Sequence, residues 1–258
     1  MLPILFVGHG SPMNAIEDNR FVATFRDLTK TFRKPKAILC ISAHWYTEGT
    51  WVTAMEHPRT IHDFGGFPKE LYAINYPAPG NRALAEHVRA LLAPHAVGFD
   101  LEWGLDHGTW TVLKHMYPNA DVPVVQLSID YNKPGVYHFE LGKKLRKLRD
   151  EEVLVMGSGN LVHNLGLIDF QNYEKEDYGF DWAKEARETL NNLLLSGGIE
   201  SLVQFEKLSD AVQLAIPTPE HYLPLLYVLG MKDAKERIEL FNDVLVAGSL
   251  SMTGLKIG

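Results

Sequence analysis

The stretch Leu5-Phe6-Val7-Gly8-His9-Gly10-Ser11-Pro12 joins an apolar run to a histidine flanked by two glycines. We predict a buried strand over residues 3–7, since a short continuous apolar run fits a strand that is covered on both faces. The glycines allow a sharp turn directly after this strand and a close approach of the backbone to a ligand. In open α/β sheets, functional side chains gather where such strands end.

The same alternation of buried strands and helical segments continues along the chain. Further strands are predicted at residues 37–42, 51–55, 122–129 and 153–156, and residues 237–257 are predicted to be rich in strands. The segment 56–80 contains four prolines and three glycines and is predicted to be a long irregular loop. Strands that alternate with helices favour an α/β fold. We expect a single domain over residues 1–258, with a mixed, mostly parallel central sheet flanked by helices on both faces.

Helices are predicted from apolar residues at helical spacing and from capping residues at their ends. Asn19 is the expected cap of a helix that carries Phe25, and Asp181 the expected cap of a later one. Near the end of the chain, Thr218 is expected to cap a helix that begins at Pro219.

Composition limits the function classes. The chain has 258 residues and a formal net charge of −7. This length suits one large domain, with two smaller ones as the alternative. The acidic balance argues against a nucleic-acid partner, which needs a basic face. The single cysteine, Cys40, excludes an intrachain disulfide and a cysteine-based zinc finger. Neither a signal peptide nor a membrane span is indicated, so we expect a cytoplasmic protein with no membrane partner.

Four of the eleven histidines lie directly after predicted strands or near predicted helix starts: His9, His44, His163 and His221. Strand ends of a parallel sheet meet at one edge, so these imidazoles are expected to converge. The positive end of a helix dipole favours neutral imidazole, which is the form that binds a metal or acts as a base. Each histidine alone is more often a hydrogen-bonded residue than a ligand, but the set together favours a metal site.

Two loops add further candidates. His107 follows Asp106 in a turn, and His62 lies in a glycine-rich loop with Phe64 and Phe67 that can line or cover a pocket. Gly157-Ser158-Gly159-Asn160 resembles part of a dinucleotide-binding fingerprint, but the third glycine and the acidic residue are absent. We therefore predict no dinucleotide site.

These motifs together resemble the 4,5-DOPA extradiol dioxygenase family, a group of class III extradiol ring-cleavage dioxygenases. The resemblance is carried by six stretches in the same order, with Gly248-Ser249-Leu250-Ser251-Met252 also matching: Gly8-His9-Gly10-Ser11-Pro12, Ser42-Ala43-His44-Trp45, Ile61-His62-Asp63-Phe64-Gly65-Gly66-Phe67-Pro68, Asp106-His107-Gly108-Thr109-Trp110, Gly159-Asn160-Leu161-Val162-His163-Asn164 and Pro217-Thr218-Pro219-Glu220-His221-Tyr222-Leu223-Pro224.

The resemblance implies an enzyme that cleaves a catechol with O2 at one divalent metal per chain, with L-DOPA (4,5-cleavage) as the expected substrate. Fe(II) would support activity, and Zn(II) is the metal expected in the protein as found. His9, His44 and His221 would be ligands, and His163 would be a fourth ligand or the base that removes a catechol proton. His107 would be a further catalytic acid–base residue. His62, Phe64, Phe67 and Trp110 would form the substrate-binding walls.

The set of ligands departs from one common pattern. Ring-cleaving iron sites often use two histidines and a carboxylate, whereas here the third position is His221 and Glu220 is expected to point elsewhere. An all-imidazole site also suits zinc. Two alternatives therefore remain open: a zinc-dependent hydrolase on the same histidines, and a non-catalytic metal-binding protein.

Overall fold

The computed structural model describes residues 1–173 and 175–258, and within these ranges the central sheet has eight strands in the order β4-β3-β5-β2-β6-β1-β10-β7. Their bounds are β1 (Ile4–Gly8), β2 (Ala37–Thr47), β3 (Thr50–Thr53), β4 (Val97–Asp100), β5 (Val124–Asp130), β6 (Val153–Gly159), β7 (Ile238–Phe241) and β10 (Gly254–Ile257). Two short strands, β8 (Leu245–Val246) and β9 (Leu250–Ser251), form a separate antiparallel pair.

The centre of the sheet is parallel and its edges are mixed. The pairs β1–β6, β2–β6, β2–β5 and β3–β4 are parallel. The pairs β3–β5, β1–β10 and β10–β7 are antiparallel. The predicted α/β architecture is thus confirmed. Because β1, β2 and β6 are neighbours that run in the same direction, the segments that follow them leave from one edge of the sheet.

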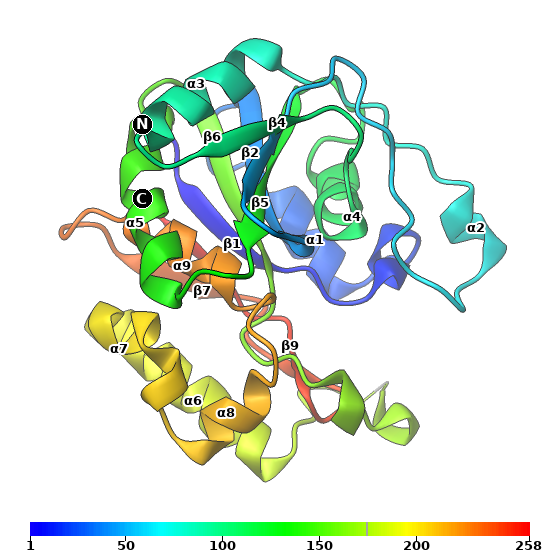
Figure 1. The fold of residues 1–258 in the computed structure, drawn as a ribbon. Coiled ribbons are helices and arrows are strands. Elements are labelled where there is room, and N and C mark those ends of the chain that lie inside the picture. The colour runs from blue at the N-terminus through cyan, green and yellow to red at the C-terminus, as the bar shows by residue number, and fades with distance from the viewer. Residues whose placement is uncertain (174) are drawn as a thin grey trace.

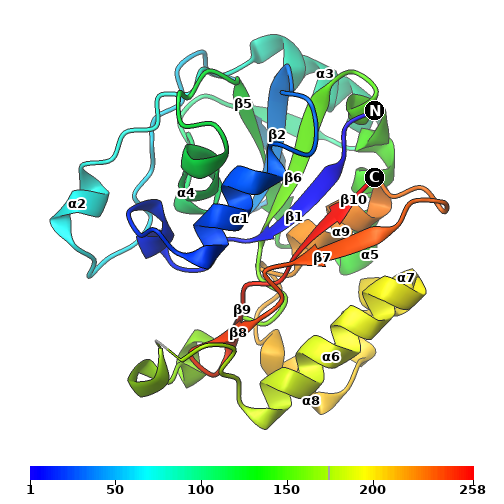
Figure 2. The same ribbon diagram turned by 180° about the vertical axis from the view of Figure 1, so that it is seen from behind.

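Helices cover both faces of this sheet, as Figures 1 and 2 show. One face carries α3 (Arg82–Leu92), α5 (Gly135–Leu145) and α9 (Leu223–Gly230), and the other carries α1 (Arg20–Leu28) and α4 (His107–Met116). A group of α6 (Asp181–Ser196), α7 (Ile199–Val203) and α8 (Asp210–Ala215) lies beside the lower end of the sheet in Figure 1, and α2 (Lys69–Tyr72) lies in the long loop after β3. In the described ranges, no helix is both long and apolar enough to span a membrane.

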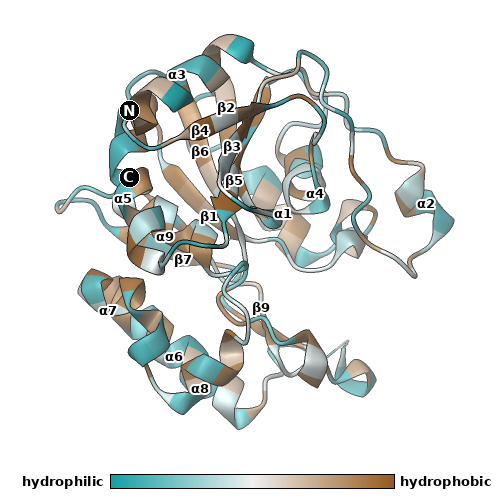
Figure 3. Ribbon diagram, viewed as in Figure 1, coloured by the Kyte–Doolittle hydropathy of each residue, from teal (hydrophilic) through white to brown (hydrophobic). Residues whose placement is uncertain are grey.

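Alternate strand residues supply the two cores. Ile4 and Phe6 of β1 belong to the core on the α5 and α9 side, whereas Leu5 and Val7 pack with the helices α1 and α4. Both faces are buried, so β1 is apolar throughout, as the sequence indicates. Figure 3 shows the same concentration of hydrophobic residues in the inner strands, with hydrophilic residues on the outer turns of the helices.

Several element boundaries differ from the sequence prediction. The strand predicted at residues 37–42 continues to Thr47, with an irregular register against β5 between Ile41 and Tyr46. The prediction misses β4, a four-residue strand at the sheet edge whose glycine weakens the sequence signal. Asn19 caps α1 as predicted, accepting hydrogen bonds from Phe21 N and Val22 N. Asp181 is the first residue of α6 and not its cap, which is Phe180.

A buried arginine joins the segment before β1 to the segment before β7. Arg149 is fully buried, and its guanidinium donates to Leu2 O at 3.0 Å, to Met231 O at 3.3 Å and to both carboxylate oxygens of Glu236. These contacts tie the segment before β1 to the chain that leads into β7. Since the charge is paired and hydrogen-bonded, burial of the guanidinium is tolerated.

We expect Arg149→Met to lower the free energy of unfolding by about 3–5 kcal/mol, because it leaves the largely buried Glu236 carboxylate without its cation. Urea unfolding followed by circular dichroism measures the change. Lys36→Met is the matched control, since Lys36 also pairs with a glutamate, Glu152, but is mostly exposed. An equal loss in both variants would contradict a special role for the buried pair.

Candidate metal centre

Five histidines from separate elements line one pocket of about 730 Å³. His9 directly follows β1, and His44 lies in the irregular part of β2. His107 is the first residue of α4, where the carboxylate of Asp106 caps the helix by accepting from Thr109 N. The remaining two follow β6 and precede α9, respectively: His163 and His221. The predicted convergence of the strand ends is therefore what the fold produces.

The imidazole rings form a compact group. The centroid of the His44 ring lies 5.0 Å from the centroid of His9, 5.1 Å from that of His221 and 3.9 Å from that of His107. His163 stacks on His221 with a centroid distance of 3.4 Å. Two sets of donor atoms each lie within 4.8 Å of one another and can hold a metal ion: His9, His44 and His107; and His163, Glu220 and His221.

Hydrogen bonds determine which nitrogen of His9 carries the proton. The hydroxyl of Ser158 donates to Gly108 O, so its oxygen can only accept from Nδ1 of His9, at 3.0 Å. The proton of His9 is therefore on Nδ1, and Nε2 presents a lone pair. In His44, Nδ1 lies 3.3 Å from Oδ2 of Asp63, and the negative charge of this carboxylate favours the tautomer that carries its proton on Nδ1.

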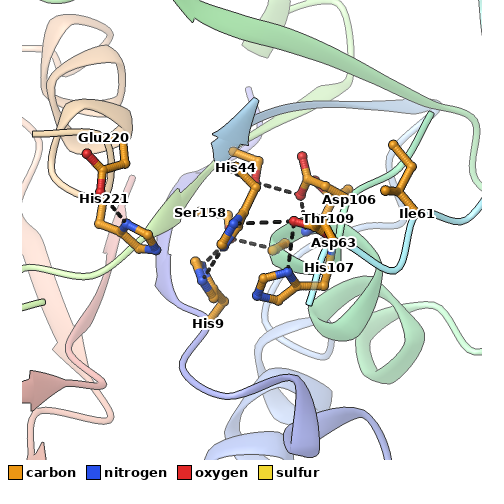
Figure 4. A network of polar contacts seen from close by, with 12 residues as sticks. His9, His44, Ile61, Asp63, Asp106, His107, Thr109, Ser158, Glu220 and His221 are labelled. Atoms are coloured by element: carbon orange, nitrogen blue, oxygen red, sulfur yellow. Dashed lines mark hydrogen bonds and ion pairs between the residues drawn. The ribbon is translucent and has the colours of Figure 1, made fainter. Parts of the chain in front are cut away.

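The arrangement of the two rings fits a bound cation. Nε2 of His9 and Nε2 of His44 lie 3.1 Å apart, and Figure 4 shows the two rings turned toward each other. With both protons on Nδ1, two lone pairs face each other in a largely buried position, an unfavourable contact unless a cation accepts them both. Two nitrogens bound to one tetrahedral zinc ion lie about 3.4 Å apart, close to this separation.

Asp63 lies against two of the histidines at once, with hydrogen bonds from His107 and an ion-pair contact with His44. Its Oδ2 lies 3.0 Å from Nδ1 of His107 and 3.3 Å from Nδ1 of His44, and its Oδ1 accepts from the backbone N–H of His107 at 2.9 Å. Burial raises the pKa of Asp63, but the hydrogen bonds and charge of His107 outweigh this effect and lower it overall. The carboxylate is therefore ionised at neutral pH.

Burial keeps the imidazoles neutral. Desolvation, with a further contribution from neighbouring histidines, lowers the pKa of His9 and of His221 well below 6.5. Desolvation also lowers the pKa of His44 to about 3 and that of His163 to about 4. Neutral imidazole is the form that binds a metal or accepts a proton, so at pH 7 these rings are ready for either task.

The end of β6 holds His221 in place by close backbone contact. Asn160 N donates to His221 O at 3.0 Å, and a Cβ atom at Gly159 would lie only 2.0 Å from that carbonyl oxygen. A Cβ at Gly157 would lie 2.7 Å from Pro224 O. The Gly-Ser-Gly sequence, which superficially resembles a dinucleotide motif, therefore serves the tight packing of β6 on α9 and supplies Ser158 to His9.

The predicted helix start at Pro219 with Thr218 as cap is wrong. The helix α9 begins at Leu223, and the backbone N–H groups of Tyr222 and Leu223 both donate to Pro219 O in a preceding turn. Thr218 donates its hydroxyl to Oε1 of Glu220 at 2.8 Å instead of capping the helix. Two prolines, at 219 and 224, carry the same sequence signal, and the second one marks the helix.

The carboxylate of Glu220 lies on the far side of the His221 ring. Its Oε1 is 3.4 Å from Nδ1 of His221, and Figure 4 shows the ring extending from there toward His9 and His44. The arrangement around His9, His44 and His221 is thus imidazole-rich, with the carboxylates of Asp63 and Glu220 placed at the Nδ1 atoms.

Apolar side chains form the remaining walls of the pocket. Phe64 and Phe67 line it and contact each other, and Phe64 also lies edge-on to His107. The opposite wall comes from the segment after His163, and consists of Leu165, Ile168, Phe170 and Tyr173. Phe170 is 77% exposed, which is high for a phenylalanine and places an apolar surface at the pocket.

His62 and Trp110, predicted as substrate-binding residues, pack against Phe64 and are not among the residues that line the pocket. Trp110 is fully buried, and its indole N–H donates to Ile61 O at 2.8 Å. His62 contacts Ile74 O through Nε2 at 3.0 Å and packs against Phe64. Both residues hold the loop that carries Asp63 and Phe64.

Sequence reasoning missed two polar residues of the site and one apolar segment. Asp63 stands next to His62, and a carboxylate beside a set of candidate ligands is a usable signal, because metal-bound imidazoles commonly donate to carboxylates. Ser158 lies within the Gly157-Ser158-Gly159 stretch, which sequence reasoning considered only as a dinucleotide motif and then excluded. The segment from Leu165 to Tyr173 offers no periodic pattern, so its place at the pocket depends on tertiary structure alone.

Comparisons with known proteins agree with this geometry. Residues 3–252 match the family described as the catalytic LigB subunit of aromatic ring-opening dioxygenase. The chain belongs to the LigB family. Within it, the chain is 50% identical to a 4,5-DOPA dioxygenase extradiol of Escherichia coli K12, over 100% of this chain and 95% of that one. A protein of the same name from Beta vulgaris is 38% identical, over 97% and 94% of the two chains.

A solved structure supports the same assignment. The crystal structure of the uncharacterized protein JW3007 from Escherichia coli K12 superposes with a TM-score of 0.86 and 44% identity, and each chain is covered completely. As a member of the LigB family, the protein is an extradiol dioxygenase, an enzyme that opens a catechol-type aromatic ring with O2. The family uses a metal, and the histidine cluster offers it a site.

We expect metal-free protein to lose stability as the pH falls from 7 to 5. The unfolded chain takes up protons on its histidines near pH 6.5, whereas the native imidazoles have lowered pKa values and stay neutral, so acid favours the unfolded state. Each such imidazole lowers the free energy of unfolding by about 2 kcal/mol between pH 6.5 and pH 5.

Urea unfolding at a series of pH values measures this loss. His221→Gln removes one of the buried imidazoles and should make the dependence on pH shallower. Stability at pH 5 equal to that at pH 7 would contradict the expectation.

Proposed function

We propose that this enzyme cleaves L-DOPA at the 4,5 position, at a mononuclear metal site held by histidines, and that residues 1–258 form a single catalytic domain. The observation that carries the metal site is the pair of facing Nε2 atoms of His9 and His44, 3.1 Å apart. The names of the Escherichia coli and Beta vulgaris relatives support L-DOPA as the substrate.

In this proposal His9, His44 and His221 hold the metal, with His163 as a fourth ligand or as the active-site base. We propose Fe(II) for activity, with Zn(II) as the alternative occupant of the imidazole set. When bound, the metal supplies the redox activity and the Lewis acidity that cleavage of a catechol with O2 requires.

His163 is suited to remove a proton from the catechol. Its lowered pKa leaves the ring neutral and able to accept a proton at pH 7, and it lines the pocket beside His221. A well-placed general base contributes about 10²–10⁴-fold to the rate. In this proposal His107, whose ring lies 3.9 Å from that of His44, first accepts a proton at Nε2 and then returns it to the product, while Asp63 holds the proton on Nδ1.

The apolar walls suit an aromatic ring. Phe64, Phe67, Ile168 and Phe170 line the same pocket as the five histidines. A catechol can therefore place its ring against carbon surfaces and its two hydroxyls toward the imidazoles. Closing the walls over the ring would exclude water, which strengthens the electrostatic interactions within the site.

We expect iron-loaded protein to consume O2 when L-DOPA is added, with a yellow ring-opened product. The experiment loads metal-stripped protein with Fe(II) without air, adds L-DOPA, admits air and follows oxygen with an electrode. His44→Ala should abolish uptake, since it removes one of the two facing nitrogens.

His87→Ala is the control, because His87 pairs with Glu151 outside the pocket and its loss should leave uptake unchanged. Absence of uptake with L-DOPA and with simple catechols would contradict ring cleavage. Metal-dependent hydrolysis without O2 would instead support a zinc hydrolase.

A further inference from the structure

The two imidazoles on either side of Asp63 have different proposed tasks. His44 is a proposed metal ligand, and His107 is a proposed acid–base residue. A single carboxylate oxygen, Oδ2 of Asp63, lies 3.3 Å from Nδ1 of His44 and 3.0 Å from Nδ1 of His107. Figure 4 shows Asp63 beside both rings, with dashed lines to each.

Asp63 is not itself placed as a metal ligand. In the His44 ring, Nδ1 faces Asp63 and Nε2 faces His9, so the carboxylate and the facing nitrogen pair lie on different sides of the imidazole. Its second oxygen is also occupied, because it accepts from the backbone N–H of His107 at 2.9 Å. The carboxylate therefore acts through the two rings.

The loop that carries Asp63 is anchored on both sides. Before it, Ile61 N donates to Leu105 O at 2.7 Å, and Ile61 O accepts from the indole N–H of Trp110 at 2.8 Å. His62 contacts Ile74 O at 3.0 Å, and after Asp63 the ring of Phe64 packs against Trp110 and Phe67. The side chain of Asp63 is only 17% exposed, so the carboxylate has little freedom to leave its position.

From these contacts we infer that Asp63 is a positioning residue that sets the orientation and protonated nitrogen of His44 and His107 together. This inference rests on the proposed function, which gives the two rings their tasks. The hydrogen bond with Nδ1 of His107 and the charge beside Nδ1 of His44 favour a proton on each Nδ1 and leave both Nε2 atoms as lone pairs. A carboxylate in this role also strengthens metal binding by the imidazole to which it is bonded.

Sharing one oxygen links the two tasks. A substitution that removes the carboxylate releases both rings, so it should weaken the metal site and disturb proton transfer in one step. A residue with a purely structural role would change stability without this combination. His62 and Trp110 act one step further away, as anchors of the loop.

The test is Asp63→Asn, which keeps the size of the side chain but replaces one acceptor oxygen with a donor. We expect the affinity for Zn²⁺, measured by competition with a chelator, to fall by about 10–100-fold. The absorption bands of the Co²⁺-loaded protein should change, since the imidazole orientation changes. With saturating Fe²⁺, kcat for L-DOPA should still fall by about 10²-fold with KM little altered, because His107 remains misplaced.

Asp63→Glu and Glu151→Gln complete the set. The Glu variant retains the carboxylate and should recover part of the metal affinity, which distinguishes positioning from a folding defect. Glu151→Gln removes the carboxylate from the His87 pair outside the pocket and should match the wild-type protein. Thermal unfolding without metal checks that each variant folds.

Wild-type Zn²⁺ affinity and wild-type kcat in Asp63→Asn would overturn the inference. Weakened metal binding with full kcat at saturating Fe²⁺ would also overturn it, since Asp63 would then act on His44 alone. If the wild-type protein consumes no O2 with any catechol, the proposed function fails. Zn²⁺ affinity and the Co²⁺ spectrum still report whether Asp63 positions the histidines.

Discussion

The close approach of two deprotonated nitrogens organises the rest of the site. Nε2 of His9 and Nε2 of His44 lie 3.1 Å apart in a largely buried position, and the hydroxyl of Ser158 and the charge of Asp63 favour the proton of each ring on Nδ1. Protonating either Nε2 would place a charge where desolvation opposes it. A metal ion satisfies both lone pairs at once, so the acceptors at Nδ1 and the burial of the rings act toward the same result.

The fold makes this approach possible by bringing parallel strand ends together. His9 follows β1 and His44 lies near the end of β2, and both strands pair in parallel with β6 between them. The same strand supplies Ser158 and, through Gly159, the close backbone contact that places His221. A side chain at Gly159 would collide with the backbone carbonyl of His221 and displace that residue, and with it its imidazole. Strand β6 therefore sets the relative positions of His9, His44 and His221.

The sequence was sufficient for the general plan, because that plan depends on local patterns. Apolar runs that end in glycine- or histidine-containing turns predict buried parallel strands with functional ends, and His9, His44, His163 and His221 were found in this way. Other parts could not be found, for physical reasons. The start of α9 was ambiguous because two prolines give the same signal, and Trp110 was assigned to the pocket although its indole N–H is used to hold the loop at Ile61. Contacts between residues distant in sequence decide such details.

The chemistry of the donor set explains why carboxylates stand behind the imidazoles here. A carboxylate bound directly to the metal would lower the charge of the site, whereas Asp63 and Glu220 lie at the Nδ1 atoms of the rings. In this position they increase the electron donation of the imidazoles and fix their orientation without occupying a coordination position. In the proposed function, a metal held by these imidazoles would have positions for a bidentate aromatic substrate and for O2. An imidazole-rich site with carboxylates at the Nδ1 atoms is thus consistent with the proposed metal binding, and Asp63 extends that arrangement to His107, the proposed proton-transfer residue.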